Sequence, residues 1–124
     1  MSSPLAVLHP MDVPRYMSVL IVARRAVEEL GLQMPDIVPD PEPGRSHSAG
    51  EFGRCYFVQG HIQIVLRFQD HTGKWLGPLP DHEVFETLAH ELAHLRYGHH
   101  KKSFWEYRNV CAAAVSRARF GGRQ

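Results

Sequence analysis

The chain has 124 residues, of which 44% are hydrophobic and 22% are charged, so it can form one modest hydrophobic core of ordinary globular composition. Its formal net charge of +1 gives no electrostatic reason to expect binding to nucleic acid or to an anionic membrane. No apolar run reaches the roughly 18 residues of a membrane span, and the N-terminus lacks the basic and apolar segments of a signal peptide.

The first predicted element is an amphipathic helix that begins after Asp12, a residue suited to cap a helix, and ends at Gly31. Apolar residues recur in this segment at steps of three and four residues, which is the period of a helix with one buried face. We assign this helix to the scaffold. Its buried face is expected to consist of Val13, Met17, Leu20, Ile21, Val27 and Leu30.

The middle of the chain predicts loops and short strands. Residues 35–50 are rich in proline and glycine, which indicates a surface loop with a short strand at Ile37–Val38. Within residues 52–68 apolar and polar residues alternate around a tight turn at Gln59–Gly60, and this pattern predicts a β-hairpin. Trp75–Leu76 is expected either to form a further short strand or to fill the core.

Two helices are predicted in the C-terminal half. One begins at Asp81, a good capping residue, and ends at Gly98, where a left-handed turn can stop it. Its buried face is expected to comprise Val84, Phe85, Leu88, Leu92 and Leu95. The other runs from about Lys101 to Arg119 and is expected to bury Phe104, Trp105, Val110, Cys111, Ala114 and Val115.

Two cysteines, Cys55 and Cys111, lie far apart and outside any C-x-x-C pair. This spacing excludes a zinc ribbon and favours two reduced, buried thiols in a cytoplasmic protein. The cysteines thus favour a cytoplasmic location. From the chain length we expect one domain over residues 1–124, with flexible ends at residues 1–11 and 120–124.

The most informative pattern is H-E-x-x-H at His90–His94, because it falls on a helix that is predicted independently. Histidines four residues apart lie on one helix face, with Cβ atoms about 6 Å apart, so both imidazoles can bind one ion such as Zn²⁺. Glu91 can accept a proton from a metal-bound water and deliver it to a leaving amine. Imidazole ligands would also accept manganese, cobalt or nickel.

A catalytic zinc site needs a third protein ligand and one open position for water. The residues alone leave three candidates for that ligand: His99 and His100, just beyond Gly98, and Glu106 in the next helix. Tyr97 lies on nearly the same helix face as His90. We expect it to pack, although a hydroxyl at this place could also stabilise an oxyanion.

The stretch from His90 to Trp105 resembles the signature of the SprT-like and YgjP-like (WLM-type) zinc metallopeptidases. These carry H-E-L-x-H, a short connector, and a histidine followed by a few polar residues and Phe, often Phe-Trp. In this chain that histidine is His100, so the resemblance implies His100 as the third ligand. A fainter resemblance extends upstream to Phe52. Small zincins of the minigluzincin type use a glutamate on the following helix, and Glu106 is the equivalent residue here.

We predict an α+β single domain in which an N-terminal helix, a small antiparallel sheet or hairpin, the H-E-x-x-H helix and a C-terminal helix follow in order. The resemblance implies that the domain is zincin-like. It also implies peptide or protein substrates, aligned by backbone pairing along an edge strand within residues 52–68. No DNA-binding segment is recognisable, so nucleic acid is not an expected partner. A membrane is not an expected partner either, because no apolar run is long enough to span one.

The function expected is that of a zinc-dependent endopeptidase, with His90, His94 and His100 as ligands and Glu91 as general base. Two alternatives stay open. A fourth ligand, His99 or Glu106, would close the site and make the zinc structural or regulatory. The same chemistry would also serve hydrolysis of a non-peptide amide.

Overall fold

The structure is a computed structural model that describes residues 8–40, 52–70 and 72–121. An N-terminal helical turn, η2 (Pro10–Asp12), leads into the first long helix, and a π-helical turn, η3 (Arg117–Gly121), follows the last. The helices and strands between them are α1 (Val13–Leu30), β1 (Asp36–Pro39), β2 (Gly53–Tyr56), β3 (His61–Ile64), β4 (Arg67–Gln69), β5 (Trp75–Pro78), α3 (Asp81–His94) and α4 (Lys102–Ser116).

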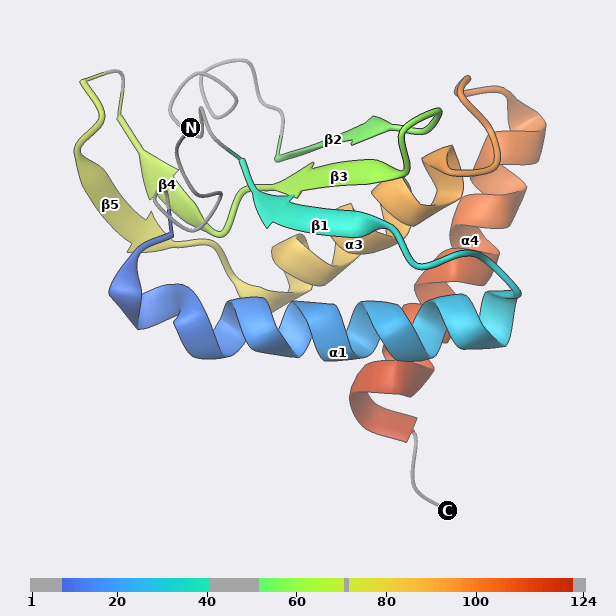
Figure 1. Ribbon diagram of the computed structural model, residues 1–124, viewed down its shortest axis with the longest axis horizontal. Helices are drawn as coiled ribbons and strands as arrows, with labels where there is room; N and C mark the ends of the chain where they lie inside the picture. The colour runs from blue at the N-terminus through green and yellow to red at the C-terminus, as the bar shows by residue number, and fades with distance from the viewer. Residues whose placement is uncertain (1–7, 41–51, 71, 122–124) are drawn as a thin grey trace.

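The architecture is α+β, as predicted. Figure 1 shows α1 along one long side of the molecule and the three-stranded sheet β1-β3-β2 along the other. Helix α3 runs between these layers and contacts the sheet, α1 and α4, while β4 and β5 form a separate two-stranded sheet. None of the described helices is long and apolar enough to cross a membrane.

The sheet contains the predicted hairpin and one strand in a parallel arrangement. Strands β2 and β3 pair antiparallel, and Gly60 in their turn has a φ of 63°, which a glycine adopts readily. Strand β1 confirms the predicted strand at Ile37–Val38, but it pairs parallel to β3, so the sheet is mixed rather than purely antiparallel. The predicted second strand of the hairpin is broken at the buried Val65–Leu66, beyond which β4 pairs with β5.

Helix α1 has the predicted bounds, but half of the predicted buried face is wrong: Val27 is buried and Leu20 and Leu30 are partly buried against the core, whereas the other three residues are exposed. Val13, Met17 and Ile21 are 44%, 49% and 51% exposed. The face that packs on the core is rotated relative to the prediction and includes two alanines, which allow the helix to approach its neighbours closely. The buried residues of α1 are Val19, Val22, Ala23, Ala26 and Val27.

Asp12 does not cap α1 with its side chain, contrary to the prediction. Its carboxylate is buried and accepts two hydrogen bonds from the guanidinium of Arg67, at 2.8 Å from Nε and 2.9 Å from Nη2. This ion pair attaches the start of α1 to β4, and both of its partners are largely shielded from water.

The two C-terminal helices exist as predicted, with differences at their ends. Helix α3 starts at Asp81, with Pro80 rather than Asp81 in the capping position, and it ends at His94, before Gly98. Its apolar face is buried as expected, except that Leu95 is only partly covered. In α4 the predicted burial of Trp105 and Val110 is wrong, because they are 46% and 49% exposed. The other predicted residues of that helix, Phe104, Cys111, Ala114 and Val115, are buried.

Candidate metal centre

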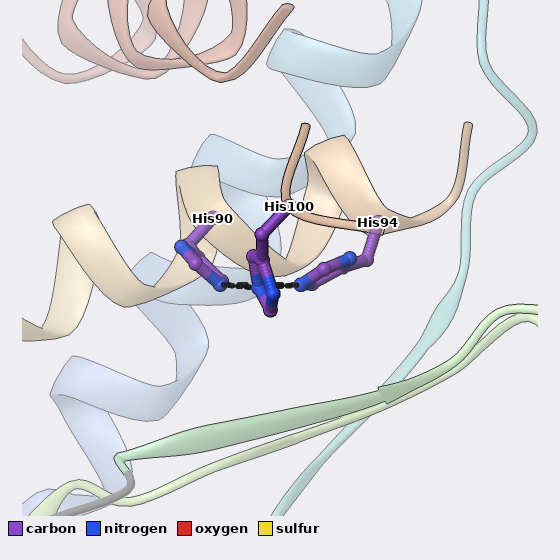
Figure 2. A group of neighbouring side chains, drawn as sticks. All are labelled: His90, His94 and His100. Carbon is purple, nitrogen blue, oxygen red and sulfur yellow. Dashed lines mark hydrogen bonds between the residues drawn. The ribbon is translucent and has the colours of Figure 1, made fainter. Parts of the chain in front are cut away.

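Three histidine side chains converge at the end of α3, and their Nε2 atoms face one another (Figure 2). The Nε2 of His94 lies 3.2 Å from that of His90 and 3.0 Å from that of His100, and the remaining pair is 3.4 Å apart. Nitrogen ligands of a tetrahedral zinc ion lie about 3.3 Å from one another, given Zn–N distances of about 2.0–2.1 Å. The three nitrogens therefore have the spacing that one zinc ion requires.

The backbone between the two helices brings the third histidine to the other two. His90 and His94 project from one face of α3, which ends at His94. The chain then turns back, so that His100 precedes the first turn of α4. Trp105 holds this turn by donating a hydrogen bond from its indole Nε1 to the carbonyl of His100, at 3.0 Å.

One of the three rings is fixed in the tautomer that a metal needs. The Nδ1 of His94 lies 2.9 Å from the carbonyl oxygen of Tyr97. A carbonyl can only accept, so Nδ1 carries the proton and Nε2 presents a lone pair to the centre of the cluster. Such an outer hydrogen bond is the usual means of orienting a metal-binding histidine.

The apolar ring of Phe104 packs against all three imidazoles. It is fully buried, and its ring stacks on His94 with centroids 4.5 Å apart and an interplanar angle of 27°. His90 and His100 each meet the same ring edge to face at 5.0 Å. Packing against one buried aromatic ring restricts the rotamers of the histidines, so their convergence is built into the fold.

The surroundings of the cluster keep two of its histidines, His90 and His94, neutral. Burial lowers the pKa of His90 to about 4, and the neighbouring His94, His100 and Arg108 add to this effect. Burial also lowers the pKa of His94, against the opposing influence of the hydrogen bond to Tyr97. Only a neutral imidazole can bind a metal, so both residues are ready to do so at pH 7.

Glu91 lies next to His90 on α3 and lines the same cleft as the three histidines. It is one of the few buried charged residues, with 5% of its surface exposed, and it lies under β2. Cys55 on β2 is close enough for the negative charge of Glu91 to act on it. Burial, together with that charge, raises the pKa of the Cys55 thiol to about 12. The thiol is therefore protonated at neutral pH and is a poor metal ligand.

The cluster and Glu91 open onto a cleft of about 770 Å³ between β2 and α3. Strand β2 is an edge strand, since the sheet order is β1-β3-β2 in the part of the chain that the structure describes. The cleft is lined by Phe52–Phe57 on the sheet side, by Glu83, Glu86, Thr87, His90, Glu91 and His94 on α3, and by Gly98, His100 and Arg108.

The other candidate residues lie outside this arrangement. His99 is exposed, and its Nδ1 accepts a hydrogen bond from the amide of Lys101 at 3.1 Å. Glu106 is exposed on α4 and is not part of the cluster. The ring of Tyr97 packs against Tyr107, with centroids 5.8 Å apart, as its packing interpretation predicts. The geometry thus favours His100 over both alternatives as the third member.

Sequence reasoning missed several contributions to the site. It did not indicate that the carbonyl of Tyr97 orients His94, that Arg108 lines the cleft, or that Gly53 lies against Glu91. These contacts depend on backbone groups or on residues far apart in the chain. The faint resemblance that extends upstream to Phe52 is the one sequence signal that includes Gly53.

Known proteins support this picture at two levels. The WLM domain family matches residues 56–123, more than half of the chain. Two solved structures have the same fold: Wss1 from S. pombe and a mutant of it in which a glutamate is replaced by glutamine. Each has a TM-score of 0.63 and covers 86% of this chain; they are 23% and 22% identical to it, over 83% and 87% of their own lengths. A search of curated proteins found no match.

The family match agrees with the WLM-type resemblance noted at His90–Trp105. A narrower relation to SprT-like, YgjP-like or minigluzincin proteins stays a prediction. With the family match and the shared fold, this chain belongs to the WLM domain family, which is of the zinc metallopeptidase type.

Proposed function

We propose that this chain is a zinc-dependent endopeptidase, in which His90, His94 and His100 bind Zn²⁺ and Glu91 is the general base. The observation that carries the proposal is the convergence of three imidazoles beside a buried carboxylate, at the wall of a cleft. Among the described residues the cluster holds three potential ligands, which leaves a fourth position open, as in catalytic rather than structural zinc sites.

Zinc, when bound, supplies a Lewis acid that polarises the substrate carbonyl and makes water acidic enough to lose a proton near neutral pH. Glu91 takes that proton as the water oxygen bonds to the carbonyl carbon. It then transfers the proton to the amide nitrogen, whose bond to the carbon breaks to release the amine. Because Glu91 is buried, its carboxylate faces little competition from bulk water for this proton.

A polypeptide suits the shape and the edges of the cleft. The outer edge of β2 offers backbone groups that an extended peptide can pair with, and α3 forms the opposite wall. We propose that substrates bind as an added strand along β2, with the scissile carbonyl at the histidine cluster. The two cysteines are free thiols, in keeping with the cytoplasmic location that we also propose.

Replacement of the base tests the proposal. In Glu91→Gln the side chain keeps its size but cannot accept a proton, so cleavage of an unfolded protein such as casein should fall by about 10²–10⁴-fold. Zinc content, measured by atomic emission on purified protein, should stay at one ion per chain. The matched control is Glu106→Gln, which changes an exposed glutamate outside the cluster and should cleave at the wild-type rate.

Two outcomes would contradict the endopeptidase. Zinc-loaded wild type that cleaves neither casein nor itself would leave a structural or regulatory site as the better explanation. Full activity in Glu91→Gln would show that another group is the base.

A further inference from the structure

We infer that Gly53 is a positioning residue for Glu91: the missing side chain at this point of β2 leaves the space in which the Glu91 carboxylate sits. The inference rests on the proposed role of Glu91 as the base and goes beyond it, because it assigns part of the catalytic geometry to a residue without a side chain. Gly53 does not touch the substrate atoms that react; it acts through Glu91.

The contacts around Gly53 show why a glycine is found there. A Cβ atom at this position would lie 2.5 Å from Cγ2 of Thr87, 3.1 Å from Oε2 of Glu91 and 3.2 Å from the carbonyl oxygen of Gln63. The first distance is a collision, and the second would force the carboxylate to move by a few tenths of an ångström. Any other residue at position 53 would therefore disturb α3 where it carries the base.

Backbone conformation does not explain the glycine. Among the described residues, only Gly31, Gly60 and Gly73 have a positive φ. Gly53 pairs with Ile64 in regular antiparallel register, a conformation that any residue can adopt. A glycine inside a strand usually costs stability and marks a place where something approaches closely. Here the approaching group is the buried carboxylate.

The side chains that β2 directs toward α3 are small in general. Alternate residues of a strand point to the same face, so Gly53 and Cys55 share the face that meets Glu91. Figure 2 shows the three imidazoles projecting from α3 and from the segment after it toward the hairpin strands β2 and β3. A close approach of β2 to α3 thus sets the position of Glu91 relative to the histidine cluster.

The experiment separates a steric effect on folding from an effect on the base. Gly53→Ala alone should be destabilised by the collision with Thr87. Thr87→Ser removes Cγ2, so the double variant Gly53→Ala/Thr87→Ser should melt within about 2 °C of Thr87→Ser and bind one zinc ion. Its contact with Glu91 remains, and since shifts of this size degrade catalysis, kcat should be about 3–10-fold below that of Thr87→Ser, with KM unchanged.

The control substitution is Gly77→Ala, because a Cβ at Gly77 would meet no atom within 4 Å. It should leave melting temperature, zinc content and kcat at wild-type values. A folded, zinc-loaded double variant with the kcat of Thr87→Ser would overturn the inference, and so would loss of zinc from that variant, since the disturbance would then lie in the ligands.

A second measurement keeps the inference testable if the wild type has no peptidase activity. Crystal structures of Thr87→Ser and of the double variant should differ in the distance from the Glu91 carboxylate to His90 Nε2 by a few tenths of an ångström. An unmoved carboxylate would refute the role of Gly53, whereas a moved carboxylate in an inactive protein would refute only the proposed function.

Discussion

Helices α1 and α3 both show apolar residues at steps of three and four, but α3 buries most of the residues that this period selects and α1 leaves half of them exposed. Val84, Phe85, Leu88 and Leu92 are at most 6% exposed, whereas Met17 and Ile21 on α1 are about half exposed, at 49% and 51%. The two helices differ in their surroundings. Helix α3 lies between the sheet, α1 and α4, so large side chains fill the space around it.

Helix α1 lies along one side of the molecule, and its buried face consists of valines and alanines. Ala23 and Ala26 are fully buried where α1 meets the core. Small side chains let helix axes come close together, so a face with two alanines can be the packed face although a neighbouring face is more hydrophobic. The apolar period thus identifies a helix well, but it ranks faces by hydrophobicity and not by how closely they can be approached.

The largest effect is expected from a substitution just after α3, where the sequence-based prediction of the site and the structure agree best. His100→Ala should weaken zinc binding by more than about 100-fold, because loss of a direct ligand exceeds the 10–100-fold cost of losing an outer partner. His99→Ala is the matched control, since this adjacent histidine is exposed and outside the cluster. Competition with a chromophoric zinc chelator gives both affinities.

The opposite result, tight binding in His100→Ala and weak binding in His99→Ala, would show that the turn after α3 folds differently. Weak binding in Glu106→Ala with normal binding in His100→Ala would instead assign the third ligand to α4.

A second test addresses the packed face of α1. Ala26→Leu adds three carbon atoms to a position with no exposed surface and should lower the free energy of unfolding by about 1–3 kcal/mol. Met17→Leu introduces the same side chain at a half-exposed site and should alter the free energy of unfolding by less than about 0.5 kcal/mol. Urea denaturation with a tryptophan fluorescence signal measures both. Equal destabilisation by the two substitutions would mean that the exposed face of α1 is covered in solution.

Much of the candidate site could be predicted because its chemistry is local. His90, Glu91 and His94 lie within about one turn of a helix, whose geometry relates them whatever the rest of the chain does. His100 follows within one short turn, but the choice between it and His99 came from a family resemblance. Spacing alone could not decide it, since the course of a turn depends on contacts such as that of Trp105 with the His100 carbonyl.

The parts of the fold that escaped prediction involve distant segments. The parallel pairing of β1 with β3 joins residues 36–39 to residues 61–64, and neither segment contains a signal for strand direction. Gly53 lies against Glu91 although the two are about 40 residues apart in the sequence. The broken strand at Val65–Leu66 has a similar origin, because its second half pairs with β5 instead of continuing the hairpin.

The smallest effect is expected from acid, which should distinguish the two helices because α3 carries the half-buried His90 and His94 whereas α1 contains no histidine. The pKa of His90 falls from 6.5 to about 4 on folding, so between these values the unfolded chain binds more protons than the folded one. The stabilisation that neutral His90 provides is therefore present above pH 6.5 and is lost as the pH falls toward 4. Allowing for solvent screening, it amounts to about 1 kcal/mol between pH 7 and pH 5. Urea denaturation in EDTA should show this loss in wild type and a smaller one in His90→Gln; equal losses would show that His90 does not titrate differently on folding.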